Sequence, residues 1–280
     1  MMKYNKYEQD EFHVVHNEGN SLNFYLAHFD EYKLALDKVR KKIHHVNEVE
    51  FFREYFRQKN NTMLYRKTGN TENPLITHWI SEVRAMSYTY CSLAKVPEFE
   101  TISTEFISDI ISSSIDTANL RELDYKLRNK GIIFIIRPSI PGLKLDGAVF
   151  KLQNGVAVLA MSLRHNRLDN FWFTLIHELA HLHLHSHLLS TPIIDDLEED
   201  TDDEIEIEAD SLASNLMIPK HKWRTSPLKY NRDDNTVIKY AKDLGIHPSI
   251  VAGRYRKESS DYHLFNELIY KFNVREYFGV

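Results

Sequence analysis

The chain has 280 residues, 42% of them hydrophobic and 12% aromatic, which is typical of a folded globular protein with a substantial core. Its 35 Lys and Arg residues against 40 Asp and Glu residues give a formal net charge of −5, which weighs against a general affinity for nucleic acids. The 9 glycines and 8 prolines argue against a low-complexity architecture, and the single cysteine, Cys91, excludes an intramolecular disulfide framework and a cysteine zinc site.

The beginning of the chain is polar and lacks the apolar run of a signal peptide. No stretch approaches the roughly 18 consecutive apolar residues of a membrane-spanning helix. We therefore expect a cytoplasmic protein without membrane association.

Residues 1–119 are expected to form a helical N-terminal region with a partner-binding or regulatory role. Rows of apolar residues separated by charged ones predict helices over residues 21–60, 74–95 and 101–114. Residues 61–73, rich in Asn, Thr and Gly, are typical of a loop or boundary. None of these segments carries recognisable chemistry, and no helix-turn-helix pair can be identified before residue 60.

A helix over residues 120–130 precedes a predicted sheet. Residues 132–136 form an unbroken apolar run, which predicts a buried strand. Residues 148–152 and 156–161 predict two more strands, and the Asn-Gly dipeptide between them is typical of a tight hairpin.

Further helices are predicted over the segment that holds His177 and His181 and around residues 206–217, 236–244 and 248–257. We therefore expect an α+β fold, in which the helical N-terminal region is followed by a second domain, residues 120–280, with a small sheet packed on helices.

The strongest chemical signal is His177-Glu178-Leu179-Ala180-His181, set in an apolar stretch. On a helix, residues four apart lie one turn above each other, so both imidazoles project from one face and can hold one Zn²⁺. Glu178 can then act as the general base toward water. Asp169 or Asn170 is expected to cap this helix. One side of this helix should pack in a hydrophobic core through a stripe of apolar residues: Leu168, Trp172, Leu175, Leu179 and Leu182.

A catalytic zinc needs three protein ligands and one open position. Glu206 is the preferred third ligand, and Asp210, four residues later on the same predicted helix, would orient a ligand histidine from behind. Glu208 projects from the other side of that helix and is the alternative ligand if the helix faces the other way.

Other histidines fit the third position less well. His187 gives the histidine spacing of metzincins, but Leu184 stands where that motif needs a glycine. His185 would place three ligands along one straight helix, too far apart for a single ion. We interpret His183, His185 and His187 as solvent-facing or structural residues.

Charge is unevenly distributed. Residues 195–208 contain ten acidic residues and no Lys or Arg, whereas residues 220–257 contain ten Lys and Arg against three Asp. Both segments are interpreted first as solvated surface. Alternatively, the acidic segment gates the site, and the basic segment binds an acidic partner or the phosphates of nucleic acid.

Three motifs resemble the ImmA/IrrE family of metallo-endopeptidases: Phe173–His181, Glu206–Asp210 and Leu216–Pro219. Three further segments look like the branch of this family that is fused to HigA-like antitoxins: Leu145–Phe150, Arg164–Phe173 and His247–Tyr255.

The resemblance implies a zincin-like catalytic domain in which His177, His181 and Glu206 bind one Zn²⁺ and Glu178 is catalytic. Members are typically paired with helix-turn-helix repressors, which some of them cleave to release stress or mobile-element genes. The first 50 residues here do not resemble the DNA-binding domain of fused members. We therefore expect a separately encoded repressor or antitoxin as partner, and no direct binding of nucleic acid.

The leading hypothesis is a zinc-dependent endopeptidase that cleaves a partner regulatory protein in a stress, toxin–antitoxin or phage-defence setting. The alternative is a catalytically silent zinc-binding antitoxin or regulatory protein.

Peptide hydrolysis also needs a group that stabilises the oxyanion, and six residues are candidates: Arg164, His165, His221, Tyr230, Arg254 and Tyr255. The strand at residues 156–161 is expected to be a sheet edge that binds the substrate by backbone pairing.

Overall fold

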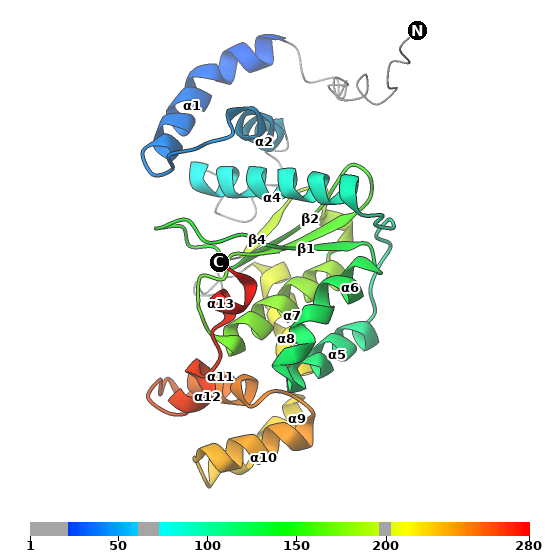
Figure 1. The fold of residues 1–280 in the computed structure, drawn as a ribbon, viewed down its shortest axis with the longest axis vertical. Helices are drawn as coiled ribbons and strands as arrows, with labels where there is room; N and C mark the ends of the chain where they lie inside the picture. Colours follow the sequence, from blue (N-terminus) through cyan, green and yellow to red (C-terminus); the bar gives the residue numbers. More distant parts are fainter. Residues whose placement is uncertain (1–21, 61–72, 196–202) are drawn as a thin grey trace.

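Helices enclose both faces of a small sheet in the computed structural model, which describes residues 22–60, 73–195 and 203–280 (Figure 1). The predicted α+β class is confirmed. Nearly all of the loop predicted at residues 61–73, and the middle of the acidic segment at 195–208, lie outside the described residues. No helix of the described chain is both long and apolar enough to cross a membrane.

The sheet has four strands in the order β1-β3-β2-β4. β1 (Ile132–Ile136) lies parallel to β3 (Ala157–Met161), whereas β2 (Gly147–Lys151) is antiparallel to both β3 and β4 (Ile193–Asp195). The predicted hairpin joins β2 to β3. Gly155 in its turn has φ +82°, a left-handed conformation that side chains disfavour.

β3 is an interior strand, so the expectation that residues 156–161 form a substrate-binding edge is wrong. The strand pairs with β1 on one side and β2 on the other, and its backbone groups are therefore used within the sheet. Among the described strands, β1 and β4 lie at the edges. The sequence did not predict β4, because three residues are too few to display a period.

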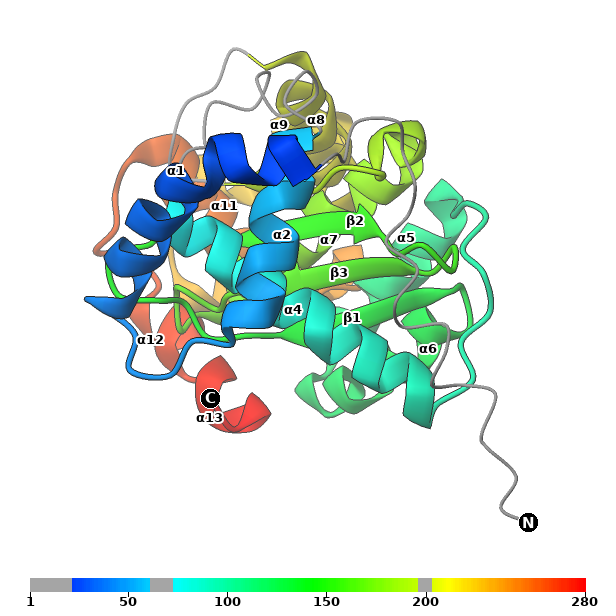
Figure 2. The ribbon, with the colours of Figure 1, turned by 90° about the horizontal axis from the view of Figure 1, so that it is seen from above.

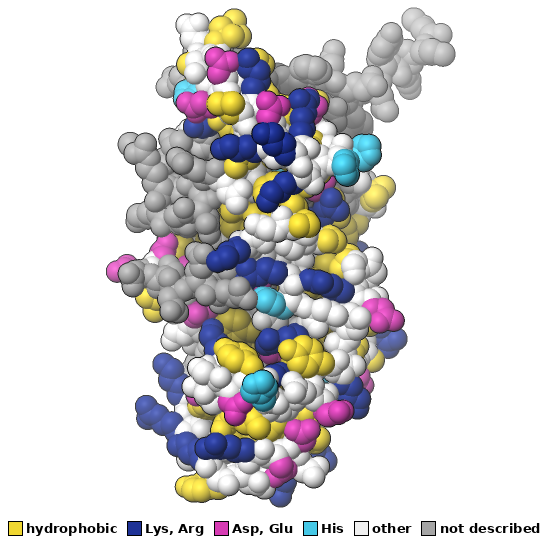
Figure 3. Space-filling view, turned by 90° about the vertical axis from the view of Figure 1, so that its left-hand side faces the viewer, with side chains coloured by type: hydrophobic (Ala, Val, Ile, Leu, Met, Phe, Trp, Pro, Cys, Tyr) yellow, Lys and Arg dark blue, Asp and Glu magenta, His cyan; other side chains and the backbone are white. Residues whose placement is uncertain are grey.

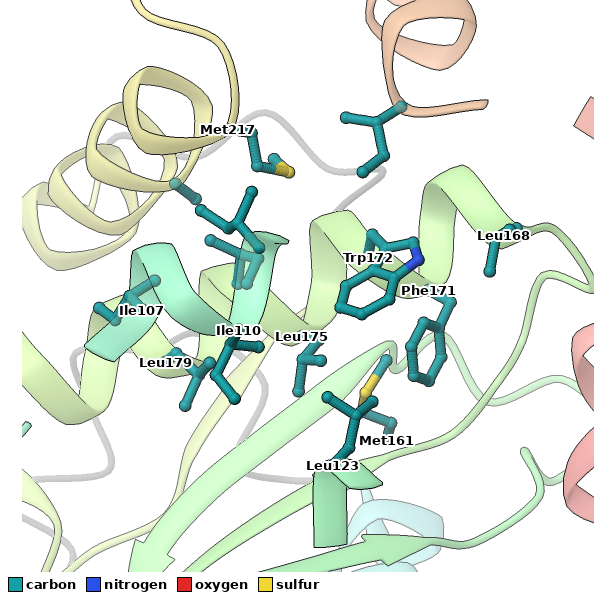
Figure 4. Packing of buried hydrophobic residues seen from close by; sticks show 14 of the residues in the cluster. Ile107, Ile110, Leu123, Met161, Leu168, Phe171, Trp172, Leu175, Leu179 and Met217 are labelled. Atoms are coloured by element: carbon teal, nitrogen blue, oxygen red, sulfur yellow. The ribbon is translucent and has the colours of Figure 1, made fainter. Parts of the chain in front are cut away.

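α7 (Leu168–Leu184) packs on one face of the sheet, with α5 (Thr104–Ser112), α6 (Leu123–Arg128) and α8 (Glu204–Met217) around it (Figure 1). The predicted apolar stripe of α7 is confirmed, since all five of its residues are at most 1% exposed. Figure 4 shows Trp172 and Leu175 of this stripe in the same cluster as Met161 of β3. This packing fixes α7 against the sheet and leaves its opposite side for chemistry.

The other face of the sheet carries α4 (Pro74–Leu93), with α1 (Leu22–Arg40) and α2 (Glu48–Asn60) packed on α4 (Figure 2). The helix predicted over residues 21–60 is therefore two helices. Oδ1 of Asn47 accepts a hydrogen bond from the backbone N–H of Glu50, and this capping interaction starts the second helix. The core of this layer includes strand residues that alternate with those facing α7: Ile133, Ile135, Phe150, Val158 and Ala160.

The C-terminal helices pack on the side of α7 away from the N-terminal layer (Figure 1). The helices predicted at 236–244 and 248–257 correspond to α10 (Asp234–Leu244) and α11 (Pro248–Ser259), and α11 contacts α7. The remaining helical segments are short: α9 (Lys220–Arg224), α12 (Asn266–Tyr270), α13 (Val274–Phe278), and the 3₁₀ turns η2 (Ser113–Ile115), η3 (Thr117–Glu122), η4 (Ser186–Leu188) and η5 (Pro227–Lys229).

A buried ion pair ties the N-terminal helices to the sheet. Glu54 of α2 accepts hydrogen bonds from Arg84 of α4 and from Arg57, each at 2.7 Å. The guanidinium of Arg84 lies 4.3 Å from the centre of the Phe150 ring in β2. Burial opposes the charged form of Glu54, but the two guanidinium groups hold the pKa of its carboxyl below the usual range. Glu54 is therefore ionised and links both helices to the sheet.

We predict that Glu54→Gln lowers the free energy of unfolding by about 3 kcal/mol, because the charge of Arg84 is left buried without its partner. The pKa of Glu54 is lower in the folded state than in the unfolded state. Its contribution is therefore present above the unfolded-state pKa and is lost as the pH falls through the folded-state pKa. Urea denaturation at neutral and acidic pH measures both effects.

The matched control is Glu50→Gln, which removes a more exposed ion pair between Glu50 and Arg53 on the same helix. This change should cost at most about 1 kcal/mol. Equal losses in the two variants would contradict a special role for the buried pair.

Candidate metal centre

α7 places His177 and His181 one turn apart on the side away from its apolar stripe. Their Nε2 atoms lie 3.0 Å from each other, and both rings are buried. The His-Glu-x-x-His spacing thus brings the two imidazoles together, as the periodicity of a helix requires.

The start of α7 differs from the expectation. The helix begins at Leu168, with Arg167 at the N-cap position and no hydrogen bond from a capping side chain. Capping by Asp169 or Asn170 is therefore wrong. Asp169 lies inside the first turn, where its carboxylate pairs with the guanidinium of Arg167 at 2.6 Å. Its negative charge also interacts favourably with the positive end of the helix dipole.

α8 brings two of the predicted acids to the histidines. Oε2 of Glu206 lies 3.2 Å from Nε2 of His177 and 3.3 Å from Nε2 of His181. Nδ1 of His177 donates a hydrogen bond to Oδ1 of Asp210 at 2.8 Å, which leaves the Nε2 lone pair directed toward Glu206. The structure therefore places Glu206 among the candidate ligands and Asp210 behind one of them. Their roles as ligand and orienting residue stay predictions.

Glu208, the alternative ligand, lies outside this group. Its Oε2 accepts a hydrogen bond from Nε2 of His185 at 3.1 Å, and Nδ1 of His185 lies 3.0 Å from Nδ1 of His181. Burial lowers the pKa of His185 and favours its neutral form, so its Nδ1 can accept the proton of Nδ1 of His181. In this hydrogen-bond relay from His181 through His185 to Glu208, Nδ1 of His181 carries the proton, so the lone pair of its Nε2 faces Glu206. The interpretation of His185 as structural agrees with this position, whereas His187 is exposed on η4, beyond the end of α7.

Asp195 joins the group although sequence reasoning did not single it out. It is the last residue of β4, and its Oδ2 lies 2.9 Å from Nε2 of His177 and 3.6 Å from Nε2 of His181. In the sequence it appears only as the first residue of an acidic run. The signal in the sequence was the apolar pair Ile193-Ile194 just before it. Such a pair can form a short buried strand, and an acid at the end of that strand can lie in a site.

The donor atoms of this group fit a metal ion. One atom from each of His177, His181, Asp195 and Glu206 lies within 4.8 Å of the others. Both carboxylate oxygens of Asp195 and Oε1 of Glu206 are buried without a hydrogen-bond partner among the described residues. Nitrogen and carboxylate ligands are those that Zn²⁺ prefers, and a buried cation would offset the charge of both carboxylates.

Without a metal, protons must supply the compensating charge. Burial opposes the charged form of His177, but the carboxylates of Asp195, Asp210 and Glu206 raise its pKa well above the usual value. Burial likewise opposes ionisation of Glu206, yet hydrogen bonds from His177 and His181 hold the pKa of its carboxyl well below the usual range. A metal ion that bound here would displace protons.

Glu178 lies beside the donors in a space that depends on a glycine. Its side chain is fully buried, and neither carboxylate oxygen has a hydrogen-bond partner in the described parts of the chain. Burial raises the pKa of Glu178 well above the usual value, and the charge of Asp195 adds to this effect. A Cβ at position 147 would overlap with Oε1 of Glu178, so the absence of a side chain at Gly147 makes room for the carboxylate.

A cleft of about 860 Å³ opens beside the donors, between α7, α8 and α11. Asp210 lines it, as does Phe173, whose ring centre lies 6.2 Å from that of His177. Nζ of Lys257 lies 4.9 Å from the centre of the Phe173 ring. The cleft also offers apolar lining from Ile207, Met217 and Ile250. It can therefore receive a peptide side chain next to the candidate metal centre.

Of the six candidates for oxyanion stabilisation, His165 and Arg254 line this cleft. Arg254 donates hydrogen bonds to the backbone oxygens of Ser214 and Ile218 at the end of α8. Tyr230 is 92% exposed. The other three lie elsewhere or have a partner: Arg164 pairs with Asp146, Tyr255 packs edge-to-face with Phe265, and His221 is exposed on α9.

A helix that carries His-Glu-x-x-His, packs on a small mixed sheet and receives an acid from the next long helix defines a domain of the metallopeptidase type. Comparison with known families agrees, because residues 128–256 match the Peptidase M78 family, described as the IrrE N-terminal-like domain. This match of residues 128–256 supports an ImmA/IrrE family metallopeptidase. The match does not distinguish branches, so an association with HigA-like antitoxins stays a prediction. A comparison with curated proteins gives no match.

We predict that His185→Phe lowers the affinity for Zn²⁺ about tenfold, because Nδ1 of His181 loses the acceptor that fixes its tautomer. Competition with a chromophoric chelator measures the affinity. His183→Phe is the matched control: Nδ1 of His183 lies 2.6 Å from the backbone oxygen of Ile102, away from the donors. The relay is refuted if both variants bind Zn²⁺ as tightly as the wild type.

Proposed function

We propose that this chain is a zinc-dependent endopeptidase, with one Zn²⁺ held by His177, His181 and Glu206. The family match supports the metallopeptidase class. The observation that carries the proposal is the convergence of these three donors beside the buried carboxylate of Glu178. When bound, Zn²⁺ supplies a Lewis acid that polarises a peptide carbonyl and acidifies water.

Glu178 is the proposed catalytic residue. Its buried side chain lies next to the donors, where a carboxylate can take a proton from the attacking water and return it to the leaving amine. Asp210 and His185 orient the ligand histidines. Each accepts a hydrogen bond from an Nδ1 atom, that of His177 and His181 respectively, and so leaves Nε2 facing the other donors. Gly147 acts by leaving room for Glu178.

The proposed substrate is a partner protein. The cleft between α7, α8 and α11 offers both apolar and charged lining to a peptide. The resemblance to ImmA/IrrE proteins favours a separately encoded helix-turn-helix regulator or antitoxin as the partner. It also favours a cytoplasmic role in a stress, toxin–antitoxin or phage-defence setting.

Residues 1–119 are the proposed partner or regulatory region, and residues 120–280 the peptidase domain. α1 presents apolar side chains to solvent: Leu22, Leu26, Phe29 and Leu34. A row of exposed apolar side chains on a helix is typical of a surface that contacts another protein.

Direct binding of nucleic acid is not part of the proposal. On the face shown in Figure 3, Lys and Arg side chains are spread among acidic ones from the N-terminal to the C-terminal helices. Within the basic segment, Arg254 pairs with Glu258 and Arg256 donates a hydrogen bond to Asn266. These side chains are engaged within the protein.

A second candidate function is that of a catalytically silent zinc-binding antitoxin or regulatory protein. The position of Asp195 favours it, because a fourth protein donor at the centre is a feature of structural zinc sites.

We predict about one zinc per wild-type chain by elemental analysis, and a large loss of zinc in Glu206→Ala. Glu178→Gln should keep its zinc but lose at least a hundredfold in cleavage, because the general base is gone. Mass spectrometry of new protein N-termini, in cells that express wild type or Glu178→Gln, measures cleavage of any cellular protein and so does not require an identified substrate. Identical N-termini in the two strains would remove the proposed enzymatic role.

We further predict that Gly147→Ala retains zinc but cleaves at least tenfold more slowly, because the added methyl group displaces the carboxylate of Glu178. Zinc content and the same N-terminal analysis measure both properties. Gly245→Ala is the control. No atom lies within 4 Å of a Cβ at that position, and its φ of +73° adds a backbone strain that Gly147→Ala lacks, so the control tests whether strain alone slows cleavage. Full activity of Gly147→Ala would show that Glu178 does not need this space.

A further inference from the structure

The carboxylate of Asp195 is held in place by the backbone of the sheet. Asp195 pairs with Gly147 in the register between β4 and β2, and its backbone oxygen accepts a hydrogen bond from the N–H of Asp146 at 2.9 Å. Its side chain is about 98% buried, since the residue is 2% exposed. The position of this acid is therefore set independently of α7 and α8, which carry the other donors.

The polar neighbours of this carboxylate belong to the site itself. Oδ2 lies 2.9 Å from Nε2 of His177, and the carboxyl of Glu178, when it carries a proton, hydrogen-bonds to Asp195. The groups that face Oδ2 are the Nε2 atoms of His177 and His181, and the hydrogen bonds at their Nδ1 atoms leave both Nε2 atoms as lone-pair donors when the rings are neutral. Two lone pairs and a buried carboxylate repel one another unless a cation lies between them.

The spacing of the donors matches a closed coordination shell. Zinc bonds of about 2.0–2.1 Å in a tetrahedron place the ligand atoms about 3.3 Å apart. The three separations among His177, His181 and Glu206 are 3.0, 3.2 and 3.3 Å. The separations from Oδ2 of Asp195 to the two histidines, 2.9 and 3.6 Å, fall in the same range. Five of the six separations therefore fit four-coordination, and the sixth, from Asp195 to Glu206, is at most 4.8 Å.

We propose that Asp195 is a fourth protein ligand, and that it keeps the metal site closed to water in the resting protein. This inference rests on the proposed zinc site of His177, His181 and Glu206, and it adds a regulatory step. Because catalytic zinc sites keep one open position, Asp195 must leave before peptide hydrolysis can begin. β4 is a three-residue strand at the sheet edge and pairs only with β2 among the described strands. The opening step of the proposal is a local shift of this strand.

The test compares the full-length wild type with Asp195→Ala and the near-isosteric Asp195→Asn. Zinc affinity is measured by competition with a chromophoric chelator. The chain is also loaded with Co²⁺, whose visible absorption reports the ligand set, and titrated with acetohydroxamate, which binds a metal only at an open position. Thermal unfolding followed by circular dichroism checks that each variant is folded. If Asp195→Ala is unfolded, the comparison is made with Asp195→Asn.

The matched control is Asp146→Asn. Asp146 is also a buried acid, 3% exposed, and it adjoins Asp195 through the backbone, but its carboxylate pairs with Arg164 at 2.8 Å. We expect at least tenfold weaker zinc binding in Asp195→Ala and less than threefold in the control. We also expect a Co²⁺ spectrum that responds to acetohydroxamate in the Asp195 variants but not in the wild type.

A wild-type Co²⁺ spectrum that responds to acetohydroxamate as the Asp195→Ala spectrum does, with equal zinc affinities, would overturn the proposal. It would leave the site of His177, His181 and Glu206 intact. A wild-type chain that binds no metal would overturn the proposed function as well, so the two failures can be distinguished.

Discussion

Negative charge gathered at one buried point is the constraint on which the rest of this site depends. Two carboxylates, from Glu206 and Asp195, meet two imidazole nitrogens in an interior where water is largely excluded. Such a cluster is stable only with a compensating positive charge, carried by protons or by a metal ion. The surrounding elements hold the donors against their mutual repulsion: α7 through its buried stripe, α8 through Asp210, and β4 through its pairing with β2.

The sheet connects this cluster to the N-terminal helices. β2 pairs with the strand that carries Asp195 and supplies Gly147 beside Glu178. On the other face of the sheet, Phe150 of the same strand contacts Arg84, the cation of the buried ion pair. β2 therefore contacts the layer of α2 and α4 on one face of the sheet and lies beside both acids of the candidate metal centre.

Local patterns in the sequence were sufficient for much of this architecture. The apolar run of β1 and the stripe of α7 identify their elements, and spacing by four places Glu206 and Asp210 on one side of α8. Asp195 escaped prediction because β4 exists only through its pairing with β2, and no period is visible in three residues. The interior position of β3 was not predicted for a similar reason. Its parallel neighbour β1 is distant in the chain, and no local sequence pattern indicates that the two strands pair. The role of Gly147 depends on a contact between a strand and a helix, and composition cannot reveal it.

The two hydrophobic cores lie on opposite faces of one sheet, so neither half of the chain is self-sufficient. A recombinant fragment that began near residue 120 would retain the histidines and acids but lose α1, α2 and α4. Apolar strand residues such as Ile133, Phe150 and Val158 would then face water. A bare sheet surface of this kind promotes self-association. The N-terminal helices thus cover an apolar surface, and a chain trimmed of them would be prone to aggregate even with its histidines and acids intact.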